Sequence, residues 1–589
     1  MRYILFIFLF LESLICLAKQ KSVLIEAEHF DYTGGWVVDQ QFIPTMGSPY
    51  LLAHGLGVPV DNATTVVTFP KKGIYYYWVR TKDWVPSQPS HPGRFKIIIN
   101  GKEQETVFGI NEQGWAWVPG GTVKIDNKSV KLELEDLTGL EGRCDAIYFS
   151  TDKADVPPND LEKMKAWRDK KLGLTKPTSA GTFDLVVVGG GISGCCAAVA
   201  AAQQGLSVAL INDRPVLGGN ASKEVRVHTE GTPLYTIVDE LNTQSYPNGD
   251  AQAILANDTI NRVVMNTENI SLYLNTYING VRKSGDRITE VVGMNTLTSE
   301  KISFAGSLFV DATGDGWVGY YAGARYMMGR EPQDEFNESL APVTADSMTQ
   351  GSTVLWNTYD SGKPSPFPAV PWAMDVAKDY NVASGEWYWE YGMNLNTIYD
   401  AEEIRDHLFR AIYGTWHNMK LKPENAYLKL NWMAYIAGKR ESRRLLGQYI
   451  LTEQDVENHV HFDDGFVEEK RDIDIHSPKK GPYDFLSVVK YKKVEPYTIP
   501  YRCFVSKDIS NLFMAGRCLS ATHVGLGSPR VMNTCGQMGV VVGSAASVCT
   551  KYNCSPFQVY TEHLEELKMI LDKLKMDNPD RAAQIHTSS

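Results

Sequence analysis

The chain has 589 residues, of which 43% are hydrophobic and 22% are charged, a composition typical of a globular protein with ample material for a core. Its formal net charge of −11 at pH 7 argues against a nucleic-acid partner, because such partners select basic surfaces. Its 9 cysteines are too few for a disulfide framework in a chain of this length.

Residues 1–18 predict a secretory signal peptide. Arg2 precedes an almost wholly apolar stretch, residues 4–17, and Ala18 supplies the small residue before cleavage. As a helix this stretch would span roughly 22 Å, less than the hydrocarbon layer of a bilayer. An uncleaved anchor and a lipoprotein site at Cys16 remain as alternatives. No other segment approaches transmembrane length. We therefore expect an exported bacterial protein, periplasmic or at the cell surface, with no integral membrane domain after signal removal.

Between residues 22 and 151 short β-type segments are separated by turns. Apolar and polar residues alternate in many of them, as over residues 94–100, and Asn100-Gly101 is typical of a hairpin turn. This spacing predicts one all-β sandwich domain.

Three motifs of this domain resemble carbohydrate-binding sandwich modules and related domains found with xanthan lyases. They are Ile25-Glu-Ala-Glu28, the aromatic segment 73–80 and Asp145-Ala-Ile-Tyr-Phe149. The resemblance implies a structural calcium ion held by Glu26, Glu28 and Asp145, since calcium prefers oxygen ligands. The alternative is that these are exposed charges on alternating strands. The domain either binds glycans or only packs against its neighbour.

Residues 152–181 predict a linker, with Pro157-Pro158, a short charged helix and a lead-in rich in Thr, Pro and Ser. A catalytic domain is predicted over residues 182–550. Residues 551–589 predict an amphipathic helix and a polar tail.

A glycine motif follows an apolar strand at residues 185–188. Gly189, Gly191 and Gly194 have the GxGxxG spacing, and an alanine-rich helix begins directly after them. A second strand is predicted at residues 206–211. Strand, turn and helix in this order predict a pyrophosphate site, because the helix start presents unpaired N–H groups to an anion.

The sequence departs from the dinucleotide pattern at the end of the second strand. Where a carboxylate usually accepts the ribose hydroxyls, this chain has Asn212, with Asp213 one residue later. Either residue could reach the ribose, and Asp213 is the predicted contact.

Three segments resemble FAD-dependent oxidoreductases with glutathione-reductase topology. The first is the xRPxLGGN element after the second strand, the second an ATGDG loop, and the third an AG(R/D) turn followed by a helix of small residues. The resemblance implies FAD contacts at Arg214, Gly218, Gly219, Asn220 and Ser222 in the first, at Asp311, Gly314 and Asp315 in the second, and at Gly516, Arg517, Gln537 and Gly539 in the third.

The predicted fold class is therefore α/β: an FAD-binding, Rossmann-type, glutathione-reductase-like domain with an inserted substrate region at about residues 325–500, preceded by an all-β sandwich. Motifs of the inserted region resemble a group of secreted bacterial FAD-dependent oxidoreductases, several of them loosely associated with xanthan lyases. A glycosylation sequon at Asn220 falls inside the cofactor element, where a glycan would block binding, and this favours a bacterial source.

Histidine is the residue expected to take a proton as hydride leaves for the flavin, because its pKa lies near neutrality. His523, just beyond the third flavin segment, is the first candidate, followed by His476 and His228. Arg443, Arg444 and Arg530 are candidates to bind a carboxylate or a sugar acid, with Arg444 the foremost catalytic candidate among them.

The sequence thus predicts FAD-dependent oxidation of a carbohydrate or a related hydroxylated small molecule, with reoxidation by an unidentified electron acceptor. Two alternatives remain open. One is a polysaccharide lyase or hydrolase whose flavin gives no net redox change, and the other is a non-catalytic glycan-binding protein.

Overall fold

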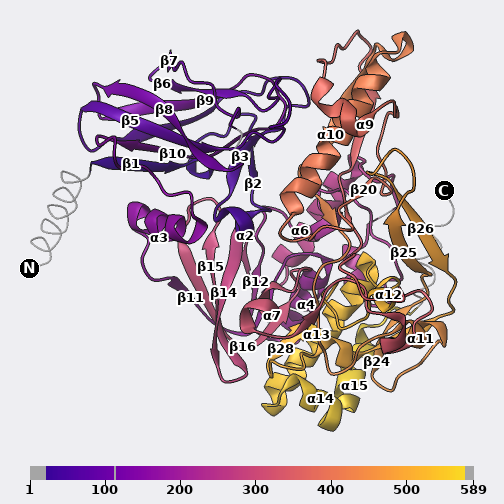
Figure 1. Ribbon diagram of the computed structural model, residues 1–589. Coiled ribbons are helices and arrows are strands. Elements are labelled where there is room, and N and C mark those ends of the chain that lie inside the picture. The colour runs from indigo at the N-terminus through magenta and orange to yellow at the C-terminus, as the bar shows by residue number, and fades with distance from the viewer. Residues whose placement is uncertain (1–20, 112–113, 244, 578–589) are drawn as a thin grey trace, which may run out of the picture. The chain divides into compact units, whose positions relative to one another are not determined.

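The computed structural model describes residues 21–111, 114–243 and 245–577, which divide into two compact units. Of the described residues, the first unit contains those from 21 to 176 together with residues 296–299 and 366–375. The second contains the remainder, from residue 177 onward (Figure 1). The predicted signal peptide lies outside the described residues.

Two antiparallel sheets form the first unit, and their facing sides share one apolar core. Strand β9 shows why the sequence pairs in this register: Val130, Leu132 and Leu134 enter the core, while the charged residues between them face outward. The larger sheet has the order β2-β3-β10-β5-β8, with β1 also paired to β10. It comprises β1 (Ser22–Glu26), β2 (Val37–Asp39), β3 (Tyr50–Ala53), β5 (Gly73–Thr81), β8 (Ala116–Ile125) and β10 (Gly142–Ser150). The smaller sheet comprises β4 (Ala63–Thr68), β9 (Ser129–Asp136), β6 (Phe95–Ile99) and β7 (Lys102–Glu103).

The helix inside the predicted linker belongs to this unit. Helix α3 (Leu161–Leu172) begins after Asp160, whose side chain accepts the N–H of Lys163, and ends at Gly173 in the left-handed conformation. Its Trp167 packs on Tyr148, with ring centroids 4.9 Å apart. The helix is therefore held against the larger sheet and is not a free hinge.

A parallel sheet is the centre of the second unit. Its parallel strands follow the order β13-β12-β11-β16-β28, and the antiparallel strands β15 and β14 continue from the first half of β16. Val188 at the end of β11 pairs with Asp311 at the end of β16, so both strands deliver the chain to the same edge. This edge lies where the strand order reverses, the place at which open α/β sheets bind ligands. The strands are β11 (Thr178–Val188), β12 (Val208–Ile211), β13 (Ile270–Tyr273), β14 (Thr276–Ser284), β15 (Arg287–Asn295), β16 (Lys301–Asp311) and β28 (Leu512–Met514).

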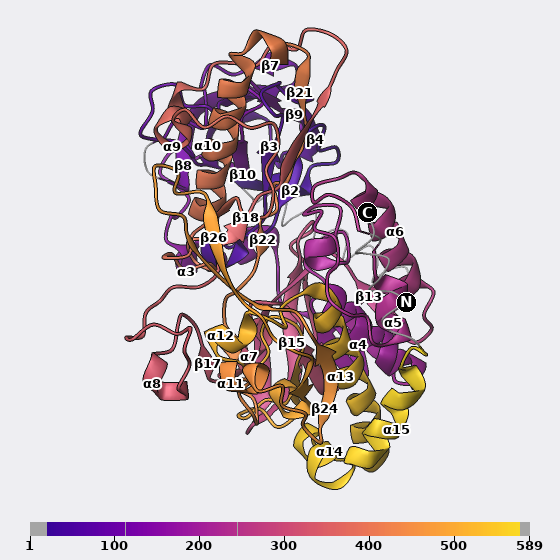
Figure 2. The same ribbon diagram turned by 90° about the vertical axis from the view of Figure 1, so that its right-hand side faces the viewer.

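Helices rich in small residues cover this sheet. Helices α4 (Ile192–Gln203) and α13 (Met532–Tyr552) lie side by side in Figures 1 and 2 and are buried along most of their length. They can approach closely because Gly543 has no side chain. A Cβ at this position would lie only 2.4 Å from the carbonyl oxygen of Ala197. The predicted C-terminal amphipathic helix is two helices, α14 (Pro556–Glu562) and α15 (Leu564–Leu574), separated at His563. Other helices of this part are α5 (Thr236–Leu241), α6 (Gln252–Met265) and α7 (Trp317–Ala322).

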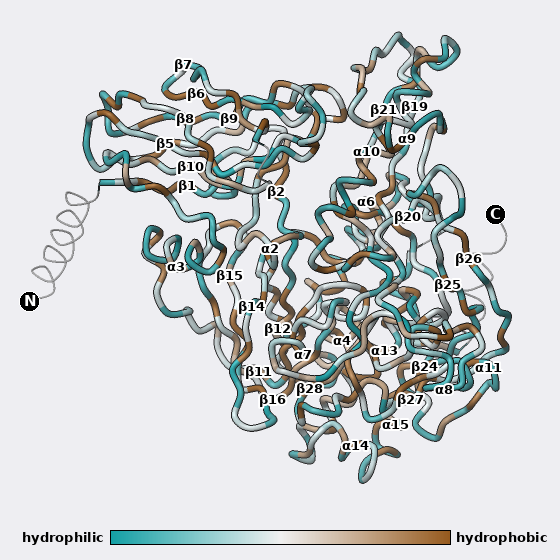
Figure 3. Tube along the Cα trace, viewed as in Figure 1, coloured by the Kyte–Doolittle hydropathy of each residue, from teal (hydrophilic) through white to brown (hydrophobic). Residues whose placement is uncertain are grey.

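The inserted substrate region of the second unit consists of small sheets and helices. Hydrophobic stretches are short there and alternate with hydrophilic ones along β25 and β26 (Figure 3). Its sheets pair β18 with β20 and β22, β19 with β21, β17 with β23, β24 with β27 and β25 with β26. The strands are β17 (Tyr326–Met327), β18 (Ser352–Thr353), β19 (Trp356–Asp360), β20 (Glu390–Tyr391), β21 (Leu428–Met433), β22 (Gly438–Lys439), β23 (Arg444–Leu445), β24 (Gly465–Glu469), β25 (Ile473–Pro478), β26 (Ser487–Lys492) and β27 (Tyr497–Pro500). Its helices include α8 (Gln333–Phe336), α10 (Ala401–Lys420) and α11 (Glu453–Glu457), and α12 (His523–Leu526) follows β28.

Candidate active site

The glycine turn between β11 and α4 leaves space for a ligand at only one of its motif glycines. Gly189 has φ +107°, and a Cβ there would lie 2.2 Å from the carbonyl oxygen of Ala312. A Cβ on Gly194 would lie 1.8 Å from the carbonyl oxygen of Gly189. At Gly191, by contrast, the nearest atom would be the Cα of Gly219 at 3.9 Å. Gly189 and Gly194 therefore shape the turn, and Gly191 provides the open face at the helix start where an anion is stabilised.

Asn212 braces this turn from the end of β12. Its Oδ1 accepts the N–H of Gly190 at 3.0 Å, and its Nδ2 donates to the carbonyls of Arg214 and Val216 at 3.1 and 2.8 Å. Because its amide is bonded within the protein, Asp213 remains the candidate for the ribose. Burial raises the pKa of Asp213, against the opposing effect of Arg214.

The xRPxLGGN element lies beside the glycine turn. Gly218 donates its N–H to the carbonyl of Gly190 at 2.8 Å and forms a bridge with Gly191. Gly218 and Gly219 both have positive φ, +104° and +60°, which favours glycine. The Ser222 hydroxyl is buried without a hydrogen-bond partner among the described residues. Arg214 pairs with Glu224 at 3.1 Å, and Asn220 donates to the carbonyl of Lys439 at 3.0 Å.

The second and third segments meet at Arg517. A Cβ on Gly314 would lie 2.5 Å from Nη2 of Arg517, and the same guanidinium lies 3.9 Å from Asp315. Gly516 has φ +92°, and a Cβ there would lie 2.8 Å from the Ser193 hydroxyl at the start of α4. The three predicted FAD segments therefore converge at one edge of the sheet. This convergence, with the open face at Gly191, fits a dinucleotide cofactor.

Three residues predicted to contact the cofactor also make contacts within the protein. Asp311 is fully buried and accepts the N–H groups of Thr313 and Gly319 at 3.1 and 3.0 Å, which fixes the start of α7. Gln537 accepts the N–H of Glu468 at 2.9 Å and donates to the carbonyls of Thr232 and Glu468, so its amide is bonded within the protein. A Cβ on Gly539 would lie 2.1 Å from the carbonyl oxygen of Ser193, so this glycine permits helix packing.

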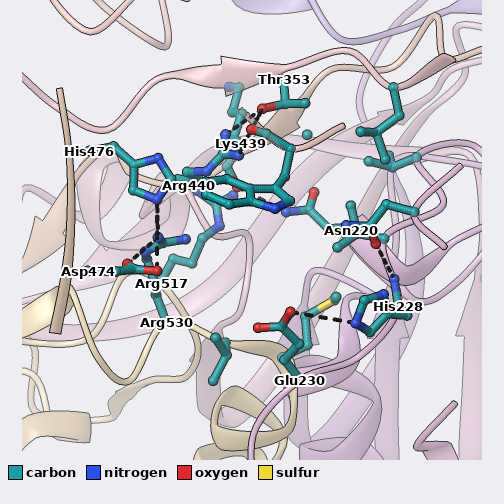
Figure 4. Close-up of a pocket in the computed structure, with 18 of the residues that line it drawn as sticks. Asn220, His228, Glu230, Thr353, Lys439, Arg440, Asp474, His476, Arg517 and Arg530 are labelled. Atoms are coloured by element: carbon teal, nitrogen blue, oxygen red, sulfur yellow. Dashed lines mark hydrogen bonds and ion pairs between the residues drawn. The ribbon is translucent and has the colours of Figure 1, made fainter. Parts of the chain in front are cut away.

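A cavity of about 360 Å³ joins the FAD segments to the substrate region. Asn220 and Arg517 of the FAD segments line it, and the inserted region contributes Arg440 and His476 (Figure 4). Other lining residues are Val225, Val227, His228, Glu230, Asn248, Thr353, Leu355, Trp387, Gly438, Lys439, Arg471, Asp474, Tyr491, Arg530, Val531 and Met532. The cavity is thus the place where a bound flavin and a substrate could meet.

His476, on β25, is a histidine with both ring nitrogens held in this cavity. Its Nδ1 lies 2.5 Å from Oε2 of Glu390 on β20. Its Nε2 lies 3.0 Å from Nη2 of Arg530 (Figure 4). Arginine can only donate, so Nε2 is the acceptor and Nδ1 carries the proton toward Glu390. Burial opposes the charge on Glu390, but Arg440 and the hydrogen bond from His476 outweigh it and lower the Glu390 pKa to about 2. Nε2 of His476 therefore carries no proton, and its lone pair accepts from Arg530 at the cavity wall.

His523, the first catalytic candidate from the sequence, does not line the cavity. Its Nδ1 lies 2.9 Å from Glu441, its backbone N–H donates to Glu331 at 2.8 Å, and the side chain is buried. The prediction that His523 is the base is not supported by this geometry, because a buried ring away from the cavity cannot reach a substrate there. His228 does line the cavity, and a hydrogen bond with Glu230 raises its pKa.

Arg444 and Arg443 also lie away from the cavity. Arg444 is fully buried, where it donates to Glu331 and to the carbonyl of Ala521, both at 2.9 Å. Arg443 lies over the rings of Trp317 and Tyr320, at 4.4 and 4.0 Å from their centroids. The guanidinium of Arg444 is thus bonded within the core, and a catalytic role for it stays a prediction. The arginines that line the cavity are Arg440, Arg471, Arg517 and Arg530.

The sequence missed Arg440 and Glu390, although Arg440 lies in the same short motif as Arg443 and Arg444. A run of cationic residues shows that several arginines lie close together in the sequence, but it does not show which of them line the cavity and which are buried in the core. Glu390 has no local signal, because its partner His476 is 86 residues away along the chain.

In the first unit, the predicted calcium ligands Glu26, Glu28 and Asp145 offer oxygens within 4.8 Å of one another, all buried. All four oxygens of the two glutamates lack hydrogen-bond partners in the described structure, which fits a cation. Two arginines already neutralise part of the negative charge of this cluster. Arg80 lies 2.6 Å from Asp145, and Arg168 of α3 contacts both Asp145 and Glu26. Burial raises the pKa of Glu26 to about 7 and that of Glu28 well above its usual value.

Comparison with known proteins supports the flavin assignment of the second unit. The family model described as FAD dependent oxidoreductase matches residues 184–570, and the chain belongs to this family. It is an enzyme family, so the protein is an FAD-dependent oxidoreductase.

Similarity to individual proteins is distant. NADH:fumarate oxidoreductase of Klebsiella pneumoniae (strain 342) is 25% identical over 142 residues, 22% of this chain and 15% of that protein. The chain therefore matches only a small part of that curated relative's length.

Solved structures that resemble this chain include a halogenase and a fumarate reductase. The myxobacterial chondrochloren halogenase CndH, an FAD-dependent halogenase, has a TM-score of 0.32 at 12% identity, over 67% of this chain and 84% of that one. A mutant form of quinol fumarate reductase FrdA of E. coli has a TM-score of 0.27 at 13% identity, over 63% of this chain and 70% of that one. Among the described residues, no helix is both long and apolar enough to cross a bilayer.

Proposed function

We propose that this enzyme oxidises a hydroxylated small molecule of the carbohydrate class, with His476 as the group that accepts the hydroxyl proton. The observation that carries the proposal is the position of His476, whose unprotonated Nε2 lines a cavity shared with the FAD segments. FAD supplies a two-electron acceptor when it is bound.

The residues around His476 suit proton transfer. Buried, ionised Glu390 orients the ring through Nδ1 and stabilises the imidazolium that forms when Nε2 takes a proton. Such a hydrogen bond fixes both the tautomer and the direction of the ring.

Trp387 favours a sugar ring as the substrate. Its side chain is 37% exposed, it lines the cavity, and its ring lies edge-on to His476 with centroids 5.6 Å apart. Aromatic faces bind the apolar faces of sugars while leaving the hydroxyls free for other contacts. A sugar stacked here would have its hydroxyls near Nε2.

Anaerobic reduction of the flavin by a panel of sugars and sugar derivatives tests this function. We expect bleaching of the yellow protein by at least one of them, and His476→Asn should slow it by about 100-fold or more with FAD content unchanged. A matched control is His407→Asn, whose ring pairs with Asp484 away from the cavity. Cleavage of the substrate without consumption of an electron acceptor would contradict the proposal. Equal rates of flavin reduction in wild type and His476→Asn would also contradict it.

The finer features of the first unit are also proposals. Export is supported by the apolar segment 4–17 and is tested by sequencing the amino terminus of the mature protein, which we expect at Lys19. Calcium binding and a glycan-binding role are supported by the carboxylate cluster and by the module-like motifs. Calorimetric titration with calcium, alone and with Glu28→Gln, tests the first, and a glycan array tests the second.

A further inference from the structure

More cationic side chains than carboxylates line the cavity. Five cationic side chains line it, Lys439, Arg440, Arg471, Arg517 and Arg530, against two lining carboxylates, Glu230 and Asp474. Two further carboxylates, Asp315 and Glu390, lie within 4 Å of these cations without lining the cavity. Because Arg517 belongs to an FAD segment, the pairing of the other four cations shows which of them lack a carboxylate of their own.

The ion pairs show which of these cations have a carboxylate partner of their own. Lys439 is paired with Asp315 at 2.8 Å. Arg471 has two partners, Glu230 at 2.5 Å and Asp474 at 3.0 Å. Arg530 lies 2.5 Å from Asp474, the carboxylate that also pairs with Arg471. Two guanidinium groups therefore share one carboxylate.

Arg440 is the other incompletely paired cation. Its guanidinium donates to the Thr353 hydroxyl at 2.6 Å and to the carbonyl of Trp387 at 2.5 Å, while Glu390 is 3.8 Å away. Arg440 and Arg530 are both drawn around the same opening, on the side of His476 (Figure 4). The two incompletely paired arginines are thus at the substrate end of the cavity.

Arg530 also has a buried donor without an acceptor. Its Nε has no hydrogen-bond partner among the described residues, although its side chain is only 12% exposed. A buried N–H without an acceptor is unfavourable, so the site is completed by a ligand that accepts. Arg517 has a similar free nitrogen, but it belongs to an FAD segment, and its donor is assigned to the cofactor.

We infer that the substrate carries a carboxylate, bound by Arg530 with Arg440 beside it, and that it is a hydroxy acid such as a sugar acid. The inference rests on the proposed function of this cavity and specifies its substrate class. A carboxylate at Arg530 places a neighbouring hydroxyl next to Nε2 of His476, since Nη2 of Arg530 is 3.0 Å from that nitrogen. Arginine suits this role because its planar fork matches a carboxylate.

Matched acidic and neutral ligands test the inference. Calorimetric titration of the FAD-loaded enzyme with gluconate and glucitol, and with glucuronate and glucose, measures binding, and anaerobic flavin reduction by the same compounds measures turnover. We expect at least one acid to bind about tenfold or more tightly than its neutral counterpart, because the contact is charge-assisted. Arg530→Gln should remove that preference and leave FAD content unchanged. Arg282→Gln, at an exposed arginine paired with Glu290, is the control and should preserve it.

The results separate this inference from the proposed function. If acids bind no more tightly than neutral sugars, or if Arg530→Gln keeps the preference, the substrate class is wrong even where flavin reduction succeeds. If acids bind tightly through Arg530 but His476→Asn reduces flavin at the wild-type rate, the substrate class stands and the role of His476 fails. An Arg530→Lys variant that restores the preference shows that Arg530→Gln acts through charge and not through misfolding.

Discussion

Glu390 and His476 are joined by a hydrogen bond of 2.5 Å between two strands, β20 and β25, that do not pair with each other. Both side chains are almost fully buried, at 1% and 3% exposure. The two residues therefore act as one unit, in which the carboxylate decides which nitrogen of the ring faces the cavity.

Removing the charge of Glu390 should reduce turnover more than binding. In Glu390→Gln the amide can still accept from Nδ1, but it no longer stabilises a protonated ring. We expect kcat for flavin reduction to fall by about 10- to 100-fold, with KM changed far less. Stopped-flow absorbance of the flavin measures this, with the exposed Glu424→Gln as control. A rise in KM and a fall in kcat, together with loss of FAD, would indicate a purely structural role.

Two glycines of the same motif should respond differently to alanine. Gly191→Ala adds a methyl group in open space, so the chain should fold normally and bind FAD more weakly, by about tenfold or more. Gly194→Ala places a methyl group against the Gly189 carbonyl, so the fold itself should be destabilised. The ratio of flavin to protein absorbance and the melting temperature distinguish the two effects. Equal FAD content in Gly191→Ala and wild type would contradict the assigned open face.

His523 should matter for stability and not for proton transfer. His523→Asn removes a buried contact to Glu441, which still has Arg444 at 3.2 Å, so we expect a loss of about 1–3 kcal/mol of stability. The folded variant should reduce its flavin at close to the wild-type rate. Urea unfolding and stopped-flow reduction check the two parts, and a large rate loss at unchanged stability would restore His523 as the base.

The carboxylate cluster of the first unit predicts a pH dependence when calcium is chelated. Burial raises the pKa of Glu26 from 4.5 to about 7. Its contribution to the stability of the fold is therefore fully present below pH 4.5, the pKa of the unfolded state, and is lost as the pH rises through 7. The free energy of unfolding should fall over this range by on the order of 3 kcal/mol, converted from the shift. Comparison of urea unfolding for wild type and Glu26→Gln isolates the effect, since the amide should flatten the dependence. Calcium should flatten it too, and identical curves for both proteins would contradict the assignment.

Much of the cofactor site could be predicted from the sequence because its signals are local. Gly189, Gly218 and Gly219 are constrained by their positive φ, and strands β11 and β16 each contain a short apolar run near their end. Asn212 shows the limit, because its place at the end of β12 is visible in the sequence but its bond to Gly190 is not.

The order of residues along the chain was enough to identify a family of flavin enzymes, because a glycine turn and two further segments follow one another in the expected order. It could not show which histidine and which arginines serve the cavity. His476 and His523 each pair with a buried glutamate, and Arg440 and Arg444 are four residues apart, so spacing cannot rank them. Their roles emerge only in the folded chain, since they depend on partners from distant strands and on whether the side chain ends in the core or at the cavity wall. Burial of this kind is set by packing between elements and not by any single stretch of residues.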